Sequence, residues 1–187
     1  MKKSMISAMT MLFLLFASAY ASISTIALAR FNSNDYVTQV FVDPSNVSEP
    51  VDNTFTIDVK ISQVTDLYGI DILFSWDPTI LEYVSHTAKV PVDTYPDGIL
   101  HTGIMILNEV DADAGTYQLA YASMGTPSFT GSGIAFNITF KVVSVGSCSL
   151  EITSSSLADA SGNPIGHDVT NGYFTNEAPP EVHDVAV

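Results

Sequence analysis

The 187-residue sequence is 47% hydrophobic, which supplies enough apolar side chains for one domain with a buried core. Six Lys and Arg stand against 20 Asp and Glu, so the formal net charge is −14. Nucleic-acid phosphates and anionic membrane surfaces would repel such a chain, and we expect no nucleic-acid partner.

Residues 1–29 have the features of a signal peptide. Two lysines near the start precede an uncharged apolar run, and small residues flank two candidate cleavage sites, near Ala21 and near Ala29. The alternative is an uncleaved anchor, because the uncharged run is long enough to span a bilayer. The Ser, Ala and Thr residues that follow its most apolar part favour cleavage. In either case we expect the remainder of the chain to be extracellular or on the cell surface.

Cys148 is the only cysteine, which excludes an intrachain disulfide. It alternates with Leu150 and Ile152, so we interpret it as a small buried hydrophobic residue rather than a reactive thiol.

From Val37 onward the hydrophobic pattern has period two, which is typical of β-strands. Turn residues such as Pro, Gly, Asn and Asp separate the alternating segments. Short strands at this spacing, with no amphipathic helix among them, predict an all-β, nine-stranded antiparallel sandwich. The expected strands are 38–43, 54–62, 69–76, 81–85, 99–107, 116–124, 133–145, 148–157 and 172–175.

The segment that ends in Trp76-Asp77-Pro78 changes direction sharply. Asp77 can accept hydrogen bonds from nearby backbone amides, and Pro78 fixes a turn and cannot donate to a strand ladder. Leu81 is then predicted to return to the core. We interpret this corner as structural.

Residues 176–187 differ in character from the rest of the chain. A Pro-Pro pair is followed by a new alternating run, which predicts a linker and the start of a further module.

Several segments together resemble the cohesin family. They are LYGIDILFSWDPTILEYVS from Leu67, GSGIAFNITFKVV from Gly131, and SLADASGNPI followed by TNGYF. The order of these segments is more specific than any one of them. The similarity covers about residues 37–175, with Trp76 at a position where the family usually has Tyr.

The resemblance implies a jelly-roll sandwich with a non-catalytic role, in which one sheet face docks a dockerin module. It also implies that calcium, where needed, is carried mainly by that partner. The outward side of the third family strand would be Asp71, Leu73 and Ser75, and these are the expected partner-binding residues. For residues 116–124, either Ala120 and Ala122 or Leu119 and Tyr121 would face outward.

Two other kinds of chemistry have weaker support. Asp111 and Asp113 place two carboxylates around a turn, as in a calcium loop, but the further acids of a helix-loop-helix calcium site are missing. The acids and the four histidines show no catalytic or metal-ligand spacing, so we expect no enzyme.

Tyr95, in a loop, is the best candidate for an exposed aromatic that stacks on a sugar ring. Direct carbohydrate binding is therefore one alternative function, and a passive surface-layer or adhesin spacer is another. Asn46 and Asn137 lie in glycosylation sequons.

Overall fold

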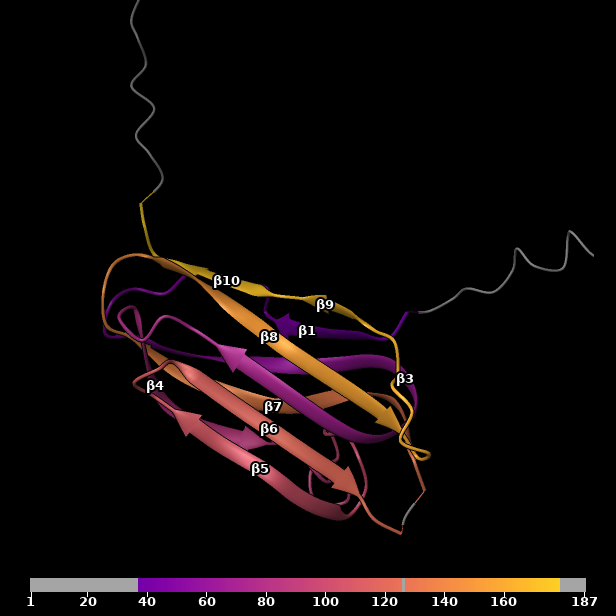
Figure 1. Ribbon diagram of the computed structural model, residues 1–187. Helices are drawn as coiled ribbons and strands as arrows, with labels where there is room; N and C mark the ends of the chain where they lie inside the picture. The colour runs from indigo at the N-terminus through magenta and orange to yellow at the C-terminus, as the bar shows by residue number, and fades with distance from the viewer. Residues whose placement is uncertain (1–36, 126, 179–187) are drawn as a thin grey trace, which may run out of the picture. The chain divides into compact units, whose positions relative to one another are not determined.

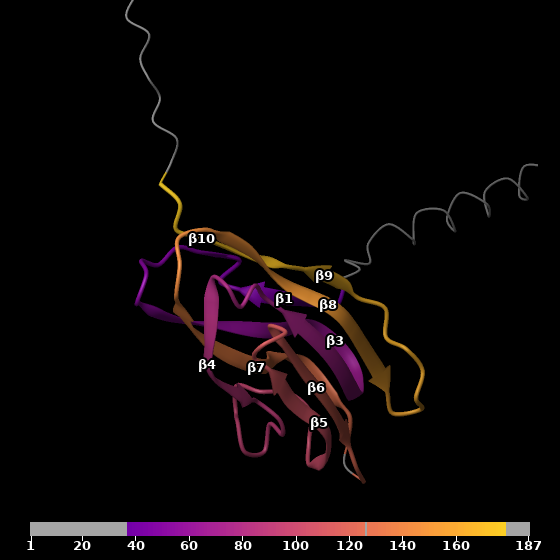
Figure 2. The same ribbon diagram turned by 60° about the vertical axis from the view of Figure 1, so that its left-hand side comes forward.

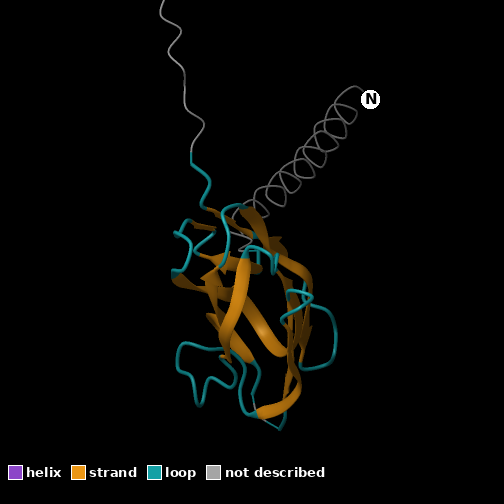
Figure 3. Ribbon diagram, turned by 90° about the vertical axis from the view of Figure 1, so that its left-hand side faces the viewer, coloured by secondary structure: helices purple, strands orange, loops and turns teal. Residues whose placement is uncertain are grey.

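The computed structural model describes residues 37–125 and 127–178, and all regular elements in this part of the chain are strands (Figure 3). Within these residues no helix could cross a membrane. The predicted signal peptide lies outside the described residues, as does the predicted linker and module beyond 178. The strands are β1 (Gln39–Asp43), β2 (Asn46–Val47), β3 (Thr54–Ser75), β4 (Leu81–Ala88), β5 (Gly103–Asp111), β6 (Thr116–Ser123), β7 (Phe129–Val142), β8 (Ser147–Asp159), β9 (Asp168–Thr170) and β10 (Gly172–Thr175).

Strand β3 belongs to both layers of the sandwich. Its first part pairs with β1 and β7, and β7 in turn pairs with β4 (Figure 2). Its last part, Leu67–Ser75, lies between β6 and β8, and β6 carries β5 on its other side (Figure 1). The two segments predicted at 54–62 and 69–76 are therefore one bent strand that connects the layers.

The bend in β3 has a local cause. Its pairing with β7 shifts register on both sides of Val64, and Gln63 and Asp66 have positive φ angles of 56° and 61°. Two amides at the bend bond to hydroxyl groups: Gln63 N to Ser132 Oγ at 3.0 Å and Asp66 N to Thr130 Oγ1 at 3.1 Å. Side chains of β7 thus satisfy these amides where the register shifts.

The sandwich prediction is confirmed, and the edges add short strands to it. β9 pairs with β1, and β2 pairs with β10, and both pairs are parallel. The two pairs are three and two residues long, so they cover the edges without a crossover helix.

The core lies between the layers and follows the alternation in the sequence. Along β3, every second residue from Ile57 to Ile61 and from Ile70 to Phe74 is buried. Cys148 is also buried, as predicted. Burial raises the pKa of its thiol, so a smaller fraction of it is present as the reactive thiolate.

The strand predicted at 99–107 lies four residues later, at Gly103–Asp111. Ile99 and Leu100 are fully buried although they belong to a loop. Backbone bonds hold this loop in place, because Ile99 N donates to Lys89 O and Val92 N donates to Leu100 O. Because these two residues are apolar and lie just upstream of β5, the sequence pattern places the start of the strand too early.

The corner after β3 has the predicted structure. Trp76 is 5% exposed and packs against Phe74, Tyr83 and Phe140, with its ring centroid 5.1 Å from that of Phe140. Asp77 Oδ1 accepts hydrogen bonds from the amide of Thr79 at 2.8 Å and from its hydroxyl at 2.6 Å.

Leu81, the first residue of β4, is fully buried. The corner thus directs the chain from the end of β3 back into the core at the start of β4, as the sequence predicted.

Candidate docking face

The outer surface of β8, β3, β6 and β5 includes the predicted partner-binding residues. The strand registers place its side chains in four rows across the four strands, each row running in the order β8, β3, β6, β5. The first row is Ala158, Gly69, Ala122 and Ile104, and the second is Ser156, Asp71, Ala120 and Leu107. The third row is Ser154, Leu73, Gln118 and Glu109, and the fourth is Glu151, Ser75, Thr116 and Asp111. We call this surface the docking face.

The structure brings Asp71, Leu73 and Ser75 together on the middle strand of this face. Asp71 is exposed, and its Oδ1 accepts a hydrogen bond from Gln118 Nε2 at 2.8 Å. Ser75 Oγ lies 2.9 Å from Thr153 Oγ1 on β8. These lateral contacts tie the central side chains of β3 to both neighbouring strands and hold them in position.

Leu73 lies in a shallow hollow of about 160 Å³ over β5 and β6. The hollow is also lined by Leu107 and by Gln118, with Glu109 and Asp111 at its acidic side. An apolar floor beside carboxylates suits a partner side chain with an apolar stem and a cationic end.

The structure settles which residues of β6 face outward. Ala120 and Ala122 pair with Asp71 and Gly69 on the docking face, although Ala120 is only 6% exposed between its neighbours. Leu119 and Tyr121 are 0% and 4% exposed and belong to the hydrophobic core. The outward residues of β6 near the first row are small. A partner can therefore approach the backbone closely there.

The face also contains an apolar flank that the sequence did not reveal. Ile104, Ile106 and Met124 are 50%, 64% and 56% exposed. The register of β5 shifts between Met105 and Leu107, so apolar residues that are consecutive in the sequence do not alternate between core and solvent. The sequence does contain a sign of this exposed flank, because residues 104–107 are all apolar. A strand with one buried face would have polar residues at alternate positions.

Within the described residues, the lysines belong to the other layer or its loops. The structure describes three lysines: Lys60 pairs with Asp43 and Asp58, Lys89 with Asp97, and Lys141 with Asp52. Each ion pair in the described part of the chain lies off the docking face. The carboxylates of the face are therefore available to cations of a partner.

The sequence predicted other sites away from the centre of this face. Tyr95 is half-buried, and Lys89 Nζ lies 5.4 Å from the centroid of its ring. Tyr173, on β10, is the one aromatic among the large hydrophobic residues that are exposed in the described chain. Tyr95 therefore does not belong to a row of exposed rings of the kind that binds a sugar chain.

Asp111 has a role in the turn between β5 and β6, since its Oδ1 accepts a hydrogen bond from Ala114 N at 3.0 Å. The part of the chain that the structure describes contains no group of three or more His, Cys, Asp or Glu side chains that could share a metal ion. The pairing of Asp111 with Asp113 as calcium ligands stays a prediction.

The glycosylation candidates lie on different strands. Asn46 is exposed at the start of β2. Asn137 is half-buried in the middle of β7, between Asp58 of β3 and Thr87 of β4. Neither residue is part of the docking face, and their modification stays a prediction.

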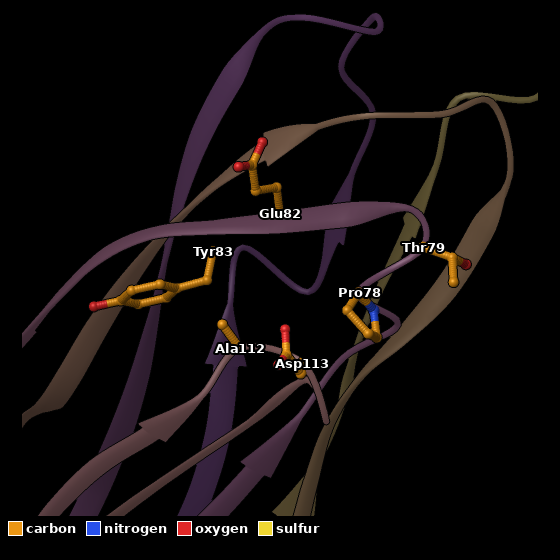
Figure 4. Close-up of a pocket in the computed structure, with 6 residues that line it drawn as sticks. All are labelled: Pro78, Thr79, Glu82, Tyr83, Ala112 and Asp113. Atoms are coloured by element: carbon orange, nitrogen blue, oxygen red, sulfur yellow. The ribbon is translucent and has the colours of Figure 1, made fainter.

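A second hollow, of about 410 Å³, lies between the corner, β4 and the turn between β5 and β6 (Figure 4). Its lining includes Glu82, Tyr83 and Asp113. In Figure 4 Glu82 extends to one side of the β4 ribbon, whereas Tyr83 and Asp113 lie on the other side. The two carboxylates thus come from opposite sides of a strand and do not converge on one point, as a pair for glycoside hydrolysis would.

A network of hydrogen bonds joins the two layers beside this hollow. His86 on β4 lies 2.7 Å by Nδ1 from Tyr83 Oη and 2.9 Å by Nε2 from Asn108 Oδ1 on β5. The hydroxyl of Tyr117, on β6, donates to the same Asn108 oxygen at 2.7 Å. Because that oxygen is an acceptor, His86 carries its proton on Nε2 when neutral, and Tyr83 donates to Nδ1. We call these four residues the clasp.

Comparison with known proteins identifies the class of this domain. The cohesin domain family matches residues 40–175, and the chain belongs to this family. The structure resembles a non-cellulosomal cohesin from Archaeoglobus fulgidus, with 18% identity and a TM-score of 0.60 over 79% of this chain and 96% of the other. Comparison with curated protein sequences found no match.

Two further structures were solved with dockerins. The sixth cohesin of scaffoldin B from Acetivibrio cellulolyticus, in complex with a Cel5 dockerin, is 18% identical, with a TM-score of 0.60 over 75% of this chain and 99% of that one. The OlpA cohesin of Clostridium thermocellum, in complex with Doc918, is 14% identical, with a TM-score of 0.61 and the same shares covered. At these identities the similarity establishes a shared fold.

Proposed function

We propose that this chain is an exported, non-catalytic module that binds a dockerin-type protein through the docking face. The observation that carries the proposal is the arrangement of Asp71, Leu73 and Ser75 on an inner strand of a four-stranded surface, in a chain of the cohesin family. Complexes of relatives with dockerins support the same kind of partner.

The face has the features of a protein interface. It combines an apolar flank on β5, hydroxyl groups on β8 and carboxylates without ion-pair partners among the described residues. Calcium belongs in this proposal to the partner, since a dockerin that folds around calcium would lose its binding surface when the ion is removed.

The assembly that the module joins need not degrade polysaccharide. One of the structural neighbours is described as non-cellulosomal, which supports a role in surface architecture outside such systems. Direct binding of carbohydrate is less well supported, because Tyr95 is half-buried and lies under Lys89.

A pull-down tests the proposal. The chain without residues 1–29 is immobilised and exposed to secreted and membrane fractions of its own organism, with calcium and then with chelator, and separately to insoluble polysaccharide. We expect calcium-dependent capture of a protein that mass spectrometry identifies as carrying a dockerin. Capture by polysaccharide alone, or no capture of any dockerin protein, would contradict the proposal.

A further inference from the structure

Tyr173 on β10 is an exposed aromatic residue outside the docking face. It is 44% exposed, and no other aromatic ring stacks on it among the described residues. Its neighbours along the strand, Gly172 and Phe174, are buried, so the side chain of Tyr173 lies on the outer surface. A single exposed ring is common on protein surfaces, and its role therefore has to be inferred from the residues beside it.

The strand register places Asn46 beside this ring. β2 and β10 pair in parallel with Asn46 opposite Tyr173, and the amide of Tyr173 donates to the carbonyl oxygen of Ser45 at 2.8 Å. Opposite residues of neighbouring strands lie about 5 Å apart and point to the same side of the sheet. On the other side of β10, which borders β8 in Figure 1, Tyr173 lies opposite the small residue Ser149. Asn46 and Tyr173 are thus exposed neighbours on one surface.

Asn46 begins the sequon Asn46-Val47-Ser48, and both of its polar residues are exposed. Nδ2 of Asn46 donates to Oγ of the adjacent Ser45 at 3.2 Å, and this contact is exposed as well. In the described part of the chain β2 is a two-residue strand at the end of the sheet, paired with β10. An enzyme can therefore reach this amide without opening the sandwich.

The second sequon is placed differently. Asn137 is half-buried in the middle of β7, and strands β3 and β4 pair with β7 on its two sides. The hydroxyl of Thr139, the third residue of that sequon, lies 2.8 Å from the hydroxyl of Thr56 on β3. The fold therefore favours modification of Asn46 over Asn137.

From these observations, and resting only on the export that is part of the proposed function, we propose that Asn46 carries an N-linked oligosaccharide whose first sugar packs against Tyr173. The donor is an oligosaccharide bound to a polyprenyl phosphate or diphosphate. Nδ2 of Asn46 forms a bond to the anomeric carbon of the donor, and the bond from that carbon to the phosphate oxygen breaks. The lipid carrier leaves with the electron pair, and the amide nitrogen loses one proton to solvent. The C–H face of the first sugar then covers the ring of Tyr173 and buries apolar surface.

Mass spectrometry of the protein from its own organism tests the modification. The chain is purified from secreted and membrane fractions, its peptides are mapped, and the variant Asn46→Gln made in the same organism is the control. We expect an oligosaccharide on Asn46, none on Asn137, and loss of that mass in the variant. An exported chain with unmodified Asn46 would overturn the inference. Absence of the chain from both fractions would contradict the exported role in the proposed function instead.

Thermal unfolding tests the part played by Tyr173. Tm is measured for the glycosylated chain and for Asn46→Gln, each with Tyr173 and with Tyr173→Ser. Loss of the oligosaccharide is expected to lower Tm by about 2–4 °C when Tyr173 is present and to have a much smaller effect with Tyr173→Ser. The same four proteins made in a host without N-glycosylation are the control, and there Asn46→Gln should leave Tm nearly unchanged. An equal loss of Tm with and without Tyr173, or no loss with Tyr173 present, would overturn the packing of the sugar on the ring.

Discussion

At the scale of single residues, the corner at Asp77 shows how a local motif determines the direction of the chain. The carboxylate of Asp77 holds Thr79 by two hydrogen bonds, and Leu81 enters the core two residues later. Both features follow from the sequence, because an Asp-Pro turn followed by an apolar residue requires only local contacts.

Leu81→Ala should lower the free energy of unfolding by about 2–5 kcal/mol, because it removes a fully buried side chain and leaves a cavity. The control is Val84→Ala on the same strand, which is 50% exposed and should change stability by about 0.5 kcal/mol or less. Chemical denaturation measures both. Equal effects of the two substitutions would contradict the packing described for the corner.

Three turn carboxylates should make stability depend on pH. Hydrogen bonds lower the pKa of Asp77, of Asp93 and of Asp159, through the side chains of Thr79, Thr102 and Asn163 first and through backbone amides second. Because the folded pKa lies below the unfolded one, each contributes stability above the ordinary carboxyl range. That contribution is lost as pH falls through the folded pKa.

The triple variant Asp77→Asn, Asp93→Asn and Asp159→Asn should therefore be less stable than the parent at about pH 7, and the difference should shrink below about pH 4. Thermal unfolding of both proteins across this range measures the difference. A gap in Tm that stays constant or widens in acid would show that these carboxylates do not act in this way.

At the scale of elements, β3 and β5 show which structural features the sequence predicts and which it does not. The face of β3 followed from simple alternation, so Asp71, Leu73 and Ser75 were placed correctly on one side. Alternation did not predict that β3 is one continuous strand. Its bend depends on hydroxyl groups of Thr130 and Ser132, which are distant in the sequence.

The exposed flank of β5 was missed for a similar reason. A register shift after Met105 breaks the period-two pattern of β5. The buried loop residues Ile99 and Leu100 are apolar and lie just upstream, so the predicted strand starts too early. Nor could the pattern choose between the two faces of β6, since Leu119, Ala120, Tyr121 and Ala122 are all compatible with burial. Pairing with β3 decides it.

The clasp is a second feature of this scale that depends on long-range pairing. Asn108 on β5 accepts hydrogen bonds from His86 of one layer and Tyr117 of the other, and Tyr117 is fully buried. Burial raises the pKa of the Tyr117 hydroxyl well above its ordinary value, so the phenol remains a neutral donor.

Asn108→Ala should lower the free energy of unfolding by about 1–3 kcal/mol, because it leaves the hydroxyl of Tyr117 without its acceptor. Glu109→Ala, at the next position of β5, is the matched control and should change stability by about 0.5 kcal/mol or less. Urea denaturation compares the two variants. Indistinguishable midpoints would mean that the clasp does not join the layers energetically.

At the scale of the whole molecule, charge and shape act together. The described lysines are neutralised by aspartates away from the docking face, whereas the carboxylates of that face are not. A net charge of −14 keeps copies of the chain apart and favours a partner with cations on its surface. The resemblance in the sequence predicted the face, but its polarity depends on strand registers that only the fold reveals.

The most direct test of the central claim is the Kd for the dockerin module, measured by isothermal titration calorimetry with three forms of the domain. They are the parent, the docking-face variant Asp71→Arg and Leu73→Glu, and the control Thr56→Arg and Ser85→Glu on the outer surface of the other layer. Docking through β8, β3, β6 and β5 predicts that the first variant loses measurable binding while its Tm stays close to that of the parent, and that the control binds like the parent. Undiminished binding by the docking-face variant, or equal loss in the control, would contradict the account.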